Sequence, residues 1–100
     1  MEKRVPHYPL AVIQTRIAKQ GIMAFTATAL FNTAAMGLTE EQVLLVLASL
    51  TRAMFYKSMT THADSTVWQD VYLSPTHIGK IAYIKLTLQQ SAVVIQFKEK

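Results

Sequence analysis

The pattern of apolar residues changes once along this chain, near residue 50. Residues 9–50 carry apolar side chains at helical spacing, and residues 54–98 consist of segments rich in β-branched and aromatic residues. Helices followed by a run of hairpin strands predict an α+β fold, in which helices pack on one face of an antiparallel sheet. A length of 100 residues suits one domain, so we expect a single domain over residues 1–100.

Three helices are predicted in the first half. In order, the pattern indicates a helix over residues 9–20, an extended segment over residues 22–25, a helix from Thr26 or Thr28 to Met36, and a helix after Thr39 whose apolar side runs to Leu50. Proline is tolerated at the start of a helix, and Gly21 and Gly37 are typical of helix ends. Thr39 and Gln42 have the spacing of a capping box, which predicts the start of the third helix.

Four strands are predicted in the second half, over residues 56–61, 66–72, 80–88 and 92–98. The last two can be aligned if Gln90 and Ser91 form a two-residue hairpin loop. One face then pairs Ile84 with Phe97, Leu86 with Ile95, and Leu88 with Val93; the other pairs Tyr83 with Lys98, Lys85 with Gln96, and Thr87 with Val94. A slip of one residue would move each side chain to the wrong face. We therefore expect Ile84, Leu86, Ile95 and Phe97 to be buried, opposite a half-polar face.

The composition excludes several classes of site. The chain has no cysteine, which excludes disulfides, thiolate zinc sites and cysteine nucleophiles. His7, His62 and His77 lie far apart without metal-ligand spacing, and the three glycines are too isolated to form a phosphate-binding loop. We therefore expect neither a metal nor a cofactor.

Charge and hydropathy bear on partners and location. The net charge of +4 allows RNA or an acidic protein as a partner, although a mildly basic surface without function gives the same value. The N-terminal segment lacks the apolar core of a signal peptide, and the longest apolar run, residues 43–48, is too short to span a bilayer. We expect a soluble, cytoplasmic protein without a membrane partner.

Polar side chains suited to chemistry recur in the apolar strand segments. They are Lys57, Gln69, Tyr83, Lys85 and Lys98. A strand face exposed to water also carries such residues without any function. Lys57 and Gln69 share a face only if the loop near residues 62–64 has an odd number of residues; an even loop places Lys57 beside Asp70. Trp68 and Tyr72 could stack on bases, but strand aromatics more often belong to the core.

Several segments resemble the signature blocks of the MqsR toxin family. They are residues 1–4, Pro6-His7, FYKSMTT at 55–61, WQDVY at 68–72, Gly79 with Tyr83 and Lys85 after it, and FKEK at 97–100. The resemblance covers essentially the whole chain. It implies a fold like that of the RelE-type toxins and a ribosome-independent endoribonuclease that cuts messenger RNA at sites with a GC step. It also implies a zinc-containing, DNA-binding antitoxin of the MqsA type, so that the toxin reaches DNA only through its antitoxin.

The same resemblance implies which residues act. The family's active-site residues fall on Lys57, Gln69 and Tyr83, and the lysine of its terminal block falls on Lys98. Cleavage of RNA without a metal requires one proton to be taken, another to be given, and the charge on the phosphate to be stabilised. We expect Tyr83 to transfer a proton or position the 2′-hydroxyl, Lys57 and Lys98 to stabilise the phosphate, Gln69 to hold the nucleotide, and Lys85 to assist RNA binding.

Two segments depart from the family pattern. Residues 22–27 lack the arginines expected before the second helix, and Leu73-Ser74-Pro75 replaces an Arg-Pro pair. Fewer arginines imply fewer phosphate contacts and weaker non-specific affinity for RNA. Two alternatives therefore stay open: a catalytically weak RNA- or antitoxin-binding module, and a regulatory subunit that acts only in a complex on DNA.

Overall fold

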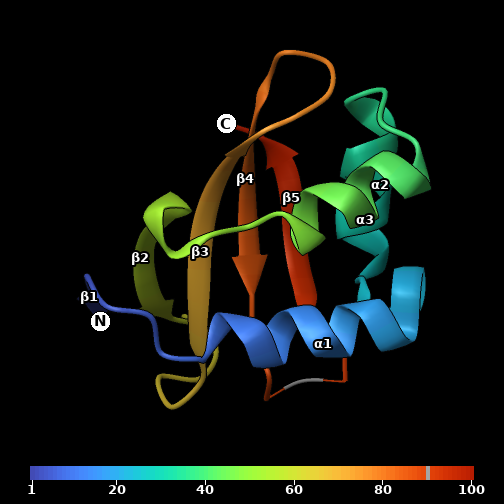
Figure 1. The fold of residues 1–100 in the computed structure, drawn as a ribbon. Coiled ribbons are helices and arrows are strands. Elements are labelled where there is room, and N and C mark those ends of the chain that lie inside the picture. Colours follow the sequence, from blue (N-terminus) through green and yellow to red (C-terminus); the bar gives the residue numbers. More distant parts are fainter. Residues whose placement is uncertain (90) are drawn as a thin grey trace.

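The strands of the second half pair in the order in which they occur in the chain. The computed structural model describes residues 1–89 and 91–100 and contains a five-stranded antiparallel sheet in the order β1-β2-β3-β4-β5. The strands are β1 (Glu2–Lys3), β2 (Phe55–Thr60), β3 (Trp68–Pro75), β4 (Ile81–Leu86) and β5 (Val94–Glu99) (Figure 1). The four longer strands lie where the sequence predicts them. β1 was not predicted, since two residues have no periodicity; it pairs with β2, with Glu2 opposite Met59.

The first half forms three α-helices. They are α1 (Leu10–Gln20), α2 (Ala27–Ala35) and α3 (Glu40–Ala48), with 3₁₀ helices at Gly21–Ala24 and Arg52–Met54. The predicted capping box is confirmed, because the Thr39 hydroxyl accepts from the Gln42 N–H and the Thr39 N–H donates to the Gln42 side chain. Among the described residues, no helix is both long and apolar enough to cross a membrane.

The prediction of an extended segment over residues 22–25 is wrong. Gly21 follows α1 with a φ of 58°, and the chain then turns through the 3₁₀ helix Gly21–Ala24. Phe25 alone is extended, and it forms a parallel bridge with Val94 of β5. A short apolar run does not distinguish a strand from a buried turn. Here the turn is followed by the bridge from Phe25 to Val94, a residue far away in the sequence.

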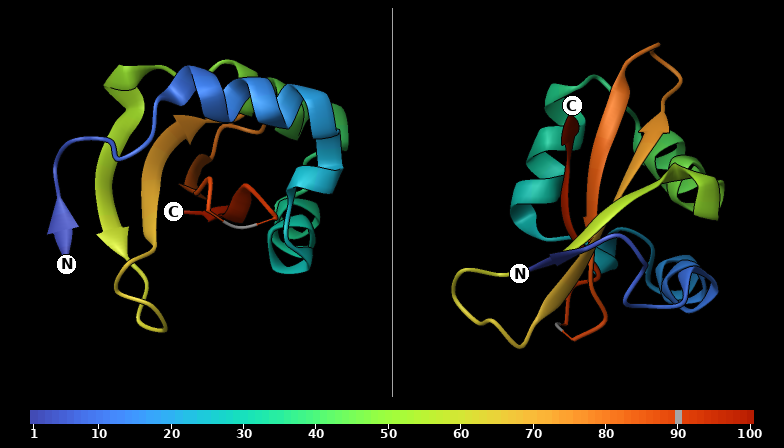
Figure 2. Two further views of the ribbon diagram at one scale, coloured as in Figure 1. Left: turned by 90° about the horizontal axis from the view of Figure 1, so that it is seen from below. Right: turned by 90° about the vertical axis from the view of Figure 1, so that its left-hand side faces the viewer.

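The sheet has a covered face and an open face. Figure 1 and both views of Figure 2 show α1 and α3 on one side of the sheet, whereas α2 lies at the β5 edge toward the other side. The core lies beneath α1 and α3, and its fully buried members include Ile13, Leu47, Tyr72, Ile84 and Phe97. The predicted α+β fold is confirmed. The open face, turned away from α1 and α3, carries Lys57, Gln69, Val71, Leu73, Tyr83, Lys85, Gln96 and Lys98.

The predicted register of β4 and β5 is confirmed over the part that carries the polar face. Tyr83 lies opposite Lys98, Ile84 opposite Phe97, and Lys85 opposite Gln96. Nearer the loop the prediction is wrong, because the pairs of Leu86 with Ile95, Thr87 with Val94, and Leu88 with Val93 do not form. Instead Leu86 lies opposite Val94 and Thr87 donates to the Val93 carbonyl. The proposed hairpin loop includes Gln90, which lies outside the described residues.

Ile95 is the extra residue of a β-bulge that causes this change of register. It remains partly exposed, although we expected it to be buried with Ile84, Leu86 and Phe97, which are. The start of α2 fastens the bulge. Thr26 donates its N–H to the Val94 carbonyl at 3.0 Å and its hydroxyl to the Ile95 carbonyl at 2.9 Å.

Candidate active site on the open face

The strand register brings the predicted site residues to one face. Across the sheet, Lys57 lies opposite Val71, Val71 opposite Lys85, and Lys85 opposite Gln96. The adjacent row contains Leu73, Tyr83 and Lys98. Gln69 lies opposite Met59, which shares the face of Lys57. Of the two loop alternatives, the structure has the odd one, since residues 61–67 connect the paired Thr60 and Trp68, and Asp70 faces Ser58 instead of Lys57.

A β-bulge in β2 directs Lys57 toward the open face. Phe55 lies opposite Tyr72 and Lys57 opposite Val71, so Tyr56 is an extra residue without a partner on β3. In a regular strand, Phe55 and Lys57 would share a face because they are two residues apart. The bulge instead lets Phe55 pack against Tyr72, with ring centroids 5.6 Å apart, while Lys57 points to the other side.

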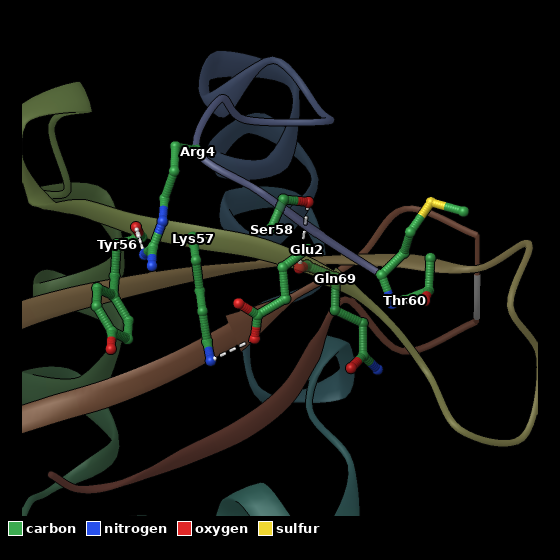
Figure 3. A network of polar contacts seen from close by, with 8 residues as sticks. Glu2, Arg4, Tyr56, Lys57, Ser58, Thr60 and Gln69 are labelled. Atoms are coloured by element: carbon green, nitrogen blue, oxygen red, sulfur yellow. Dashed lines mark hydrogen bonds and ion pairs between the residues drawn. The ribbon is translucent and has the colours of Figure 1, made fainter.

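Lys57 forms an ion pair at the edge of the sheet. Its Nζ lies 2.9 Å from Oε1 of Glu2 on β1, and the two side chains are 18% and 49% exposed. The hydrogen bond to Glu2 raises the pKa of Lys57; partial burial opposes the rise, while the charge of Glu2 and the nearby Tyr83 and Tyr56 support it. Figure 3 shows Glu2, Lys57 and Gln69 extending to the same side of the sheet. Lys57 is therefore a paired cation on the open face, and its Nζ lies 5.4 Å from the centre of the Tyr56 ring.

Lys85 and Lys98 lie on either side of Tyr83 in β4 and β5. The Lys98 Nζ lies 5.5 Å from the centre of the Tyr83 ring. Burial lowers the pKa of Lys85, and the positive charges of Lys98 and Lys57 lower it further. The ion pairs among the described residues leave Lys85 and Lys98 without a carboxylate partner. This part of the open face is therefore positively charged around a phenol.

Gln69 and Asp70 are adjacent on β3 but lie in opposite environments. Gln69 is 9% exposed. Apart from its strand hydrogen bonds, its backbone carbonyl accepts a hydrogen bond from the Ser58 hydroxyl at 3.4 Å. The Gln69 side-chain amide remains without a protein partner among the described residues. Asp70 is fully buried, and its carboxylate accepts from the N–H groups of His7 and Tyr8 and from the Ser58 hydroxyl. Asp70 thus fastens the segment that leads into α1.

The remaining candidate residues lie away from the open face. Tyr72 belongs to the core, as favoured from the sequence. Trp68 is half-buried beneath the N-terminal segment, where the His7 ring stacks on it at 5.2 Å and the Lys3 Nζ lies 4.2 Å from its ring centre. His7, His62 and His77 are all exposed. The described residues contain no cluster of three or more His, Asp or Glu side chains that could hold a metal ion.

Three side chains beside Lys57 were not anticipated from the sequence: Glu2, Arg4 and Tyr56. The Arg4 guanidinium donates to the Tyr56 carbonyl at 3.4 Å, and its carbon lies 5.7 Å from the centre of the Tyr56 ring. Glu2 and Arg4 are brought there by β1 and the residues after it, which have no sequence signal for this contact. The sequence contains one signal for the bulge at Tyr56: Phe55 is suited to the core and Lys57 to the open face, although residues two apart in a regular strand share a face.

Two comparisons with known proteins show what this chain is similar to. The chain matches the family described as "Motility quorum-sensing regulator, toxin of MqsA" over residues 5–99. It is also 38% identical over 100 residues to the mRNA interferase toxin MqsR of Escherichia coli (strain K12), in an alignment that covers 100% of both chains.

Proposed function

Because the chain belongs to the MqsR family of toxins, we propose that it is the toxin of a toxin–antitoxin pair and an endoribonuclease that cleaves messenger RNA. The observation that carries the proposal is the full-length match to a relative named mRNA interferase toxin. The open face supports it, since a phenol, an amide and three ammonium groups lie together there. We further propose that cleavage takes place in the cytoplasm, without the ribosome, at sites containing a GC step.

The reaction uses the substrate's own 2′-hydroxyl. Its oxygen attacks the adjacent phosphorus and loses its proton, and the bond from phosphorus to the 5′-oxygen breaks as that oxygen takes up a proton. The products are a 2′,3′-cyclic phosphate and a free 5′-hydroxyl. The enzyme must therefore accept one proton, donate another, and stabilise the negative charge that builds on the phosphate.

We assign these tasks to side chains of the open face. Tyr83 transfers a proton or positions the 2′-hydroxyl, because its phenol lies among the ammonium groups. Lys57 and Lys98 stabilise the phosphate, since the Lys98 Nζ lies 5.5 Å from the centre of the Tyr83 ring and Lys57 extends from the same face of the sheet. Gln69 holds the nucleotide through the amide that makes no hydrogen bond within the described residues. Lys85 adds positive charge for RNA binding.

For the partner, we propose a proteinaceous antitoxin of the MqsA type. An acidic surface would complement a chain of net charge +4, and a partner strand could extend the sheet beyond the short β1. An exposed sheet edge is a liability that such a partner relieves. Pull-down from the native host should return a small acidic or DNA-binding protein, and its absence would count against this partner.

Expression of the chain without an antitoxin tests the central proposal. We expect growth arrest and loss of intact transcripts, and cleavage of purified RNA in the presence of a chelator. The alternative is an RNA- or antitoxin-binding module with weak catalysis. It is favoured by the two segments that lack the family's arginines, and it predicts RNA binding without cleavage or growth arrest.

A further inference from the structure

Tyr56 is an aromatic residue that the core does not use. As the extra residue of the β2 bulge it has no partner on β3, and its side chain is 43% exposed. Its chain neighbours are engaged: Phe55 packs against the core, and Lys57 is bound to Glu2. Among the described residues, Phe31 is the other exposed aromatic; it lies on α2, at the opposite edge of the sheet. An open ring beside Lys57 therefore needs an explanation other than folding.

Two cations lie beside the Tyr56 ring (Figure 3). The Lys57 Nζ is 5.4 Å and the Arg4 guanidinium carbon 5.7 Å from the ring centre. Both distances approach the limit of about 6 Å for a cation–π contact. The contacts are therefore loose, and a flat partner can displace either cation from the ring without disturbing the core.

We propose that Tyr56 is a base-stacking site for single-stranded RNA, which places one base on the phenol ring and the adjoining phosphates on Lys57 and Arg4. The inference rests on the proposed ribonuclease function and adds a nucleotide-binding position to it. Single strands are bound by an aromatic ring next to a track of positive charge, because every base can stack and every nucleotide carries a phosphate. Lys57 joins this position to the Tyr83 cluster, so one strand can occupy both.

The bulge explains how β2 serves both purposes. Bulges are enriched next to active sites, where they re-aim side chains. Here the same extra residue turns Lys57 to the open face and leaves Tyr56 free of the ladder. The Arg4 hydrogen bond to the Tyr56 carbonyl then holds the bulged backbone in place. A ring held in this way loses little freedom when a base binds.

The test is binding of a short single-stranded RNA with a central GC step, made non-cleavable by 2′-O-methylation and followed by fluorescence anisotropy. Tyr56→Ala should weaken binding roughly 5- to 150-fold, whereas Tyr56→Phe should stay within about twofold because the ring is kept. Phe31→Ala is the matched control and should bind like wild type. If Tyr56→Ala does not fold, Tyr56→Leu replaces it, since leucine keeps bulk without an aromatic face.

Abasic probes identify the contact. One base at a time is replaced by an abasic residue; at the stacked position wild type should lose affinity, and Tyr56→Ala should lose nothing further. On unmodified RNA, the cleavage defect of Tyr56→Ala should appear in KM, with kcat largely retained.

Equal binding by Tyr56→Ala and wild type, with cleavage intact, would overturn the stacking site and leave the proposed ribonuclease function unaffected. A loss that is the same with every abasic probe would also overturn it, because the ring would then contact backbone or a protein partner. If wild type neither binds nor cleaves RNA, both proposals fail.

Discussion

The two sides of β3 use polar side chains in opposite ways. On the covered side, the fully buried Asp70 carboxylate accepts from two backbone N–H groups and a hydroxyl. On the open side, one residue earlier, Gln69 is 9% exposed and its amide has no hydrogen-bond partner within the described residues. A polar group with its partners built in serves the fold. One that is positioned and unengaged is available to a ligand.

Tyr72 complicates this contrast, because it lies on the covered side and its hydroxyl has no partner. It is the one buried side-chain polar atom in the described residues that lacks a hydrogen bond. Burial raises the pKa of Tyr72, the charge of Asp70 raises it further, and Arg52 opposes the rise. The covered side thus contains one polar group that stabilises the fold and one that costs stability.

The largest effect on RNA cleavage should come from removing the Tyr83 hydroxyl on the open side. If Tyr83 handles a proton, Tyr83→Phe should lower the rate of RNA cleavage on the order of 10²–10⁴-fold. The ring is kept, so the urea midpoint should stay unchanged. A nearly silent Tyr83→Phe would mean that the ring merely packs. His62→Ala is the control, since His62 is exposed in the loop after β2; an inactive His62→Ala beside an active Tyr83→Phe would favour a histidine-based ribonuclease.

Separate substitutions of Asp70 and Gln69 test whether the two sides of β3 serve different purposes. Asp70→Ala should destabilise the protein by about 3 kcal/mol, because it leaves the part-buried N–H of His7 and the buried N–H of Tyr8 without an acceptor. Gln69→Ala should reduce cleavage and toxicity while costing less than about 1 kcal/mol of stability. Urea unfolding and single-turnover cleavage measure the two quantities. The reverse pattern would show that we have exchanged the structural and the ligand-binding side.

Tyr72→Phe should stabilise the protein by about 1 kcal/mol at neutral pH, because it removes a buried hydroxyl without a partner. It should also change the alkaline limb of the stability curve. A raised folded-state pKa means that stability is fully present below the unfolded value of about 10 and is lost as the pH rises through the higher folded value. Phenylalanine does not titrate, so the variant should resist alkaline unfolding better. Equal alkaline limbs for both proteins would contradict this assignment.

Lys85→Met should have a smaller effect, visible in the salt dependence of RNA binding. If Lys85 contacts a phosphate, the slope of log affinity against log salt should fall by about 0.7. The pKa of Lys85 is lowered, so its positive charge contributes to RNA binding at low pH and is lost as the pH rises through this lowered value. The loss should occur at a lower pH than for an ordinary lysine. Lys80→Met is the control, as Lys80 pairs with Glu99 at the surface. An unchanged slope in Lys85→Met would remove Lys85 from the binding surface.

The smallest effect should come from Glu2→Gln. Glu2 competes with phosphate for Lys57, so its neutralisation should tighten RNA binding at low salt by up to about fivefold. The difference should disappear at high salt, where exposed charges are screened. Weaker binding by Glu2→Gln would instead mean that the ion pair orients Lys57 for the substrate.

The parts of this fold that alternate regularly could be predicted from the sequence. The pairing of Tyr83 with Lys98 and of Lys85 with Gln96 follows from a consistent apolar face. The common face of Lys57 and Gln69 could be stated only as a condition on the length of the loop between their strands. The two bulges break the alternation, and each depends on a distant contact: Thr26 fastens Ile95, and Arg4 binds the Tyr56 carbonyl. β1 and the Glu2 ion pair to Lys57 depend on the same kind of contact. Apart from the need of Phe55 and Lys57 for opposite faces, no local sequence pattern predicts these features.

The bulge at Tyr56 has a consequence for how this protein can evolve. Most positions of β2 can be substituted without affecting which side the others face, because the period of a strand is set by the backbone. Regular pairing of Phe55, Tyr56 and Lys57 with β3 would put the core residue and the site residue on the same side, because they are two residues apart. Deleting Tyr56 would instead make them neighbours in a regular strand, and they would still face opposite sides. Keeping Phe55 and Lys57 on opposite sides therefore does not require an extra residue. Descendants of this gene that use another way to bind RNA should be able to lose Tyr56 and the bulge together, whereas those that keep the bulge should keep an aromatic ring at this position.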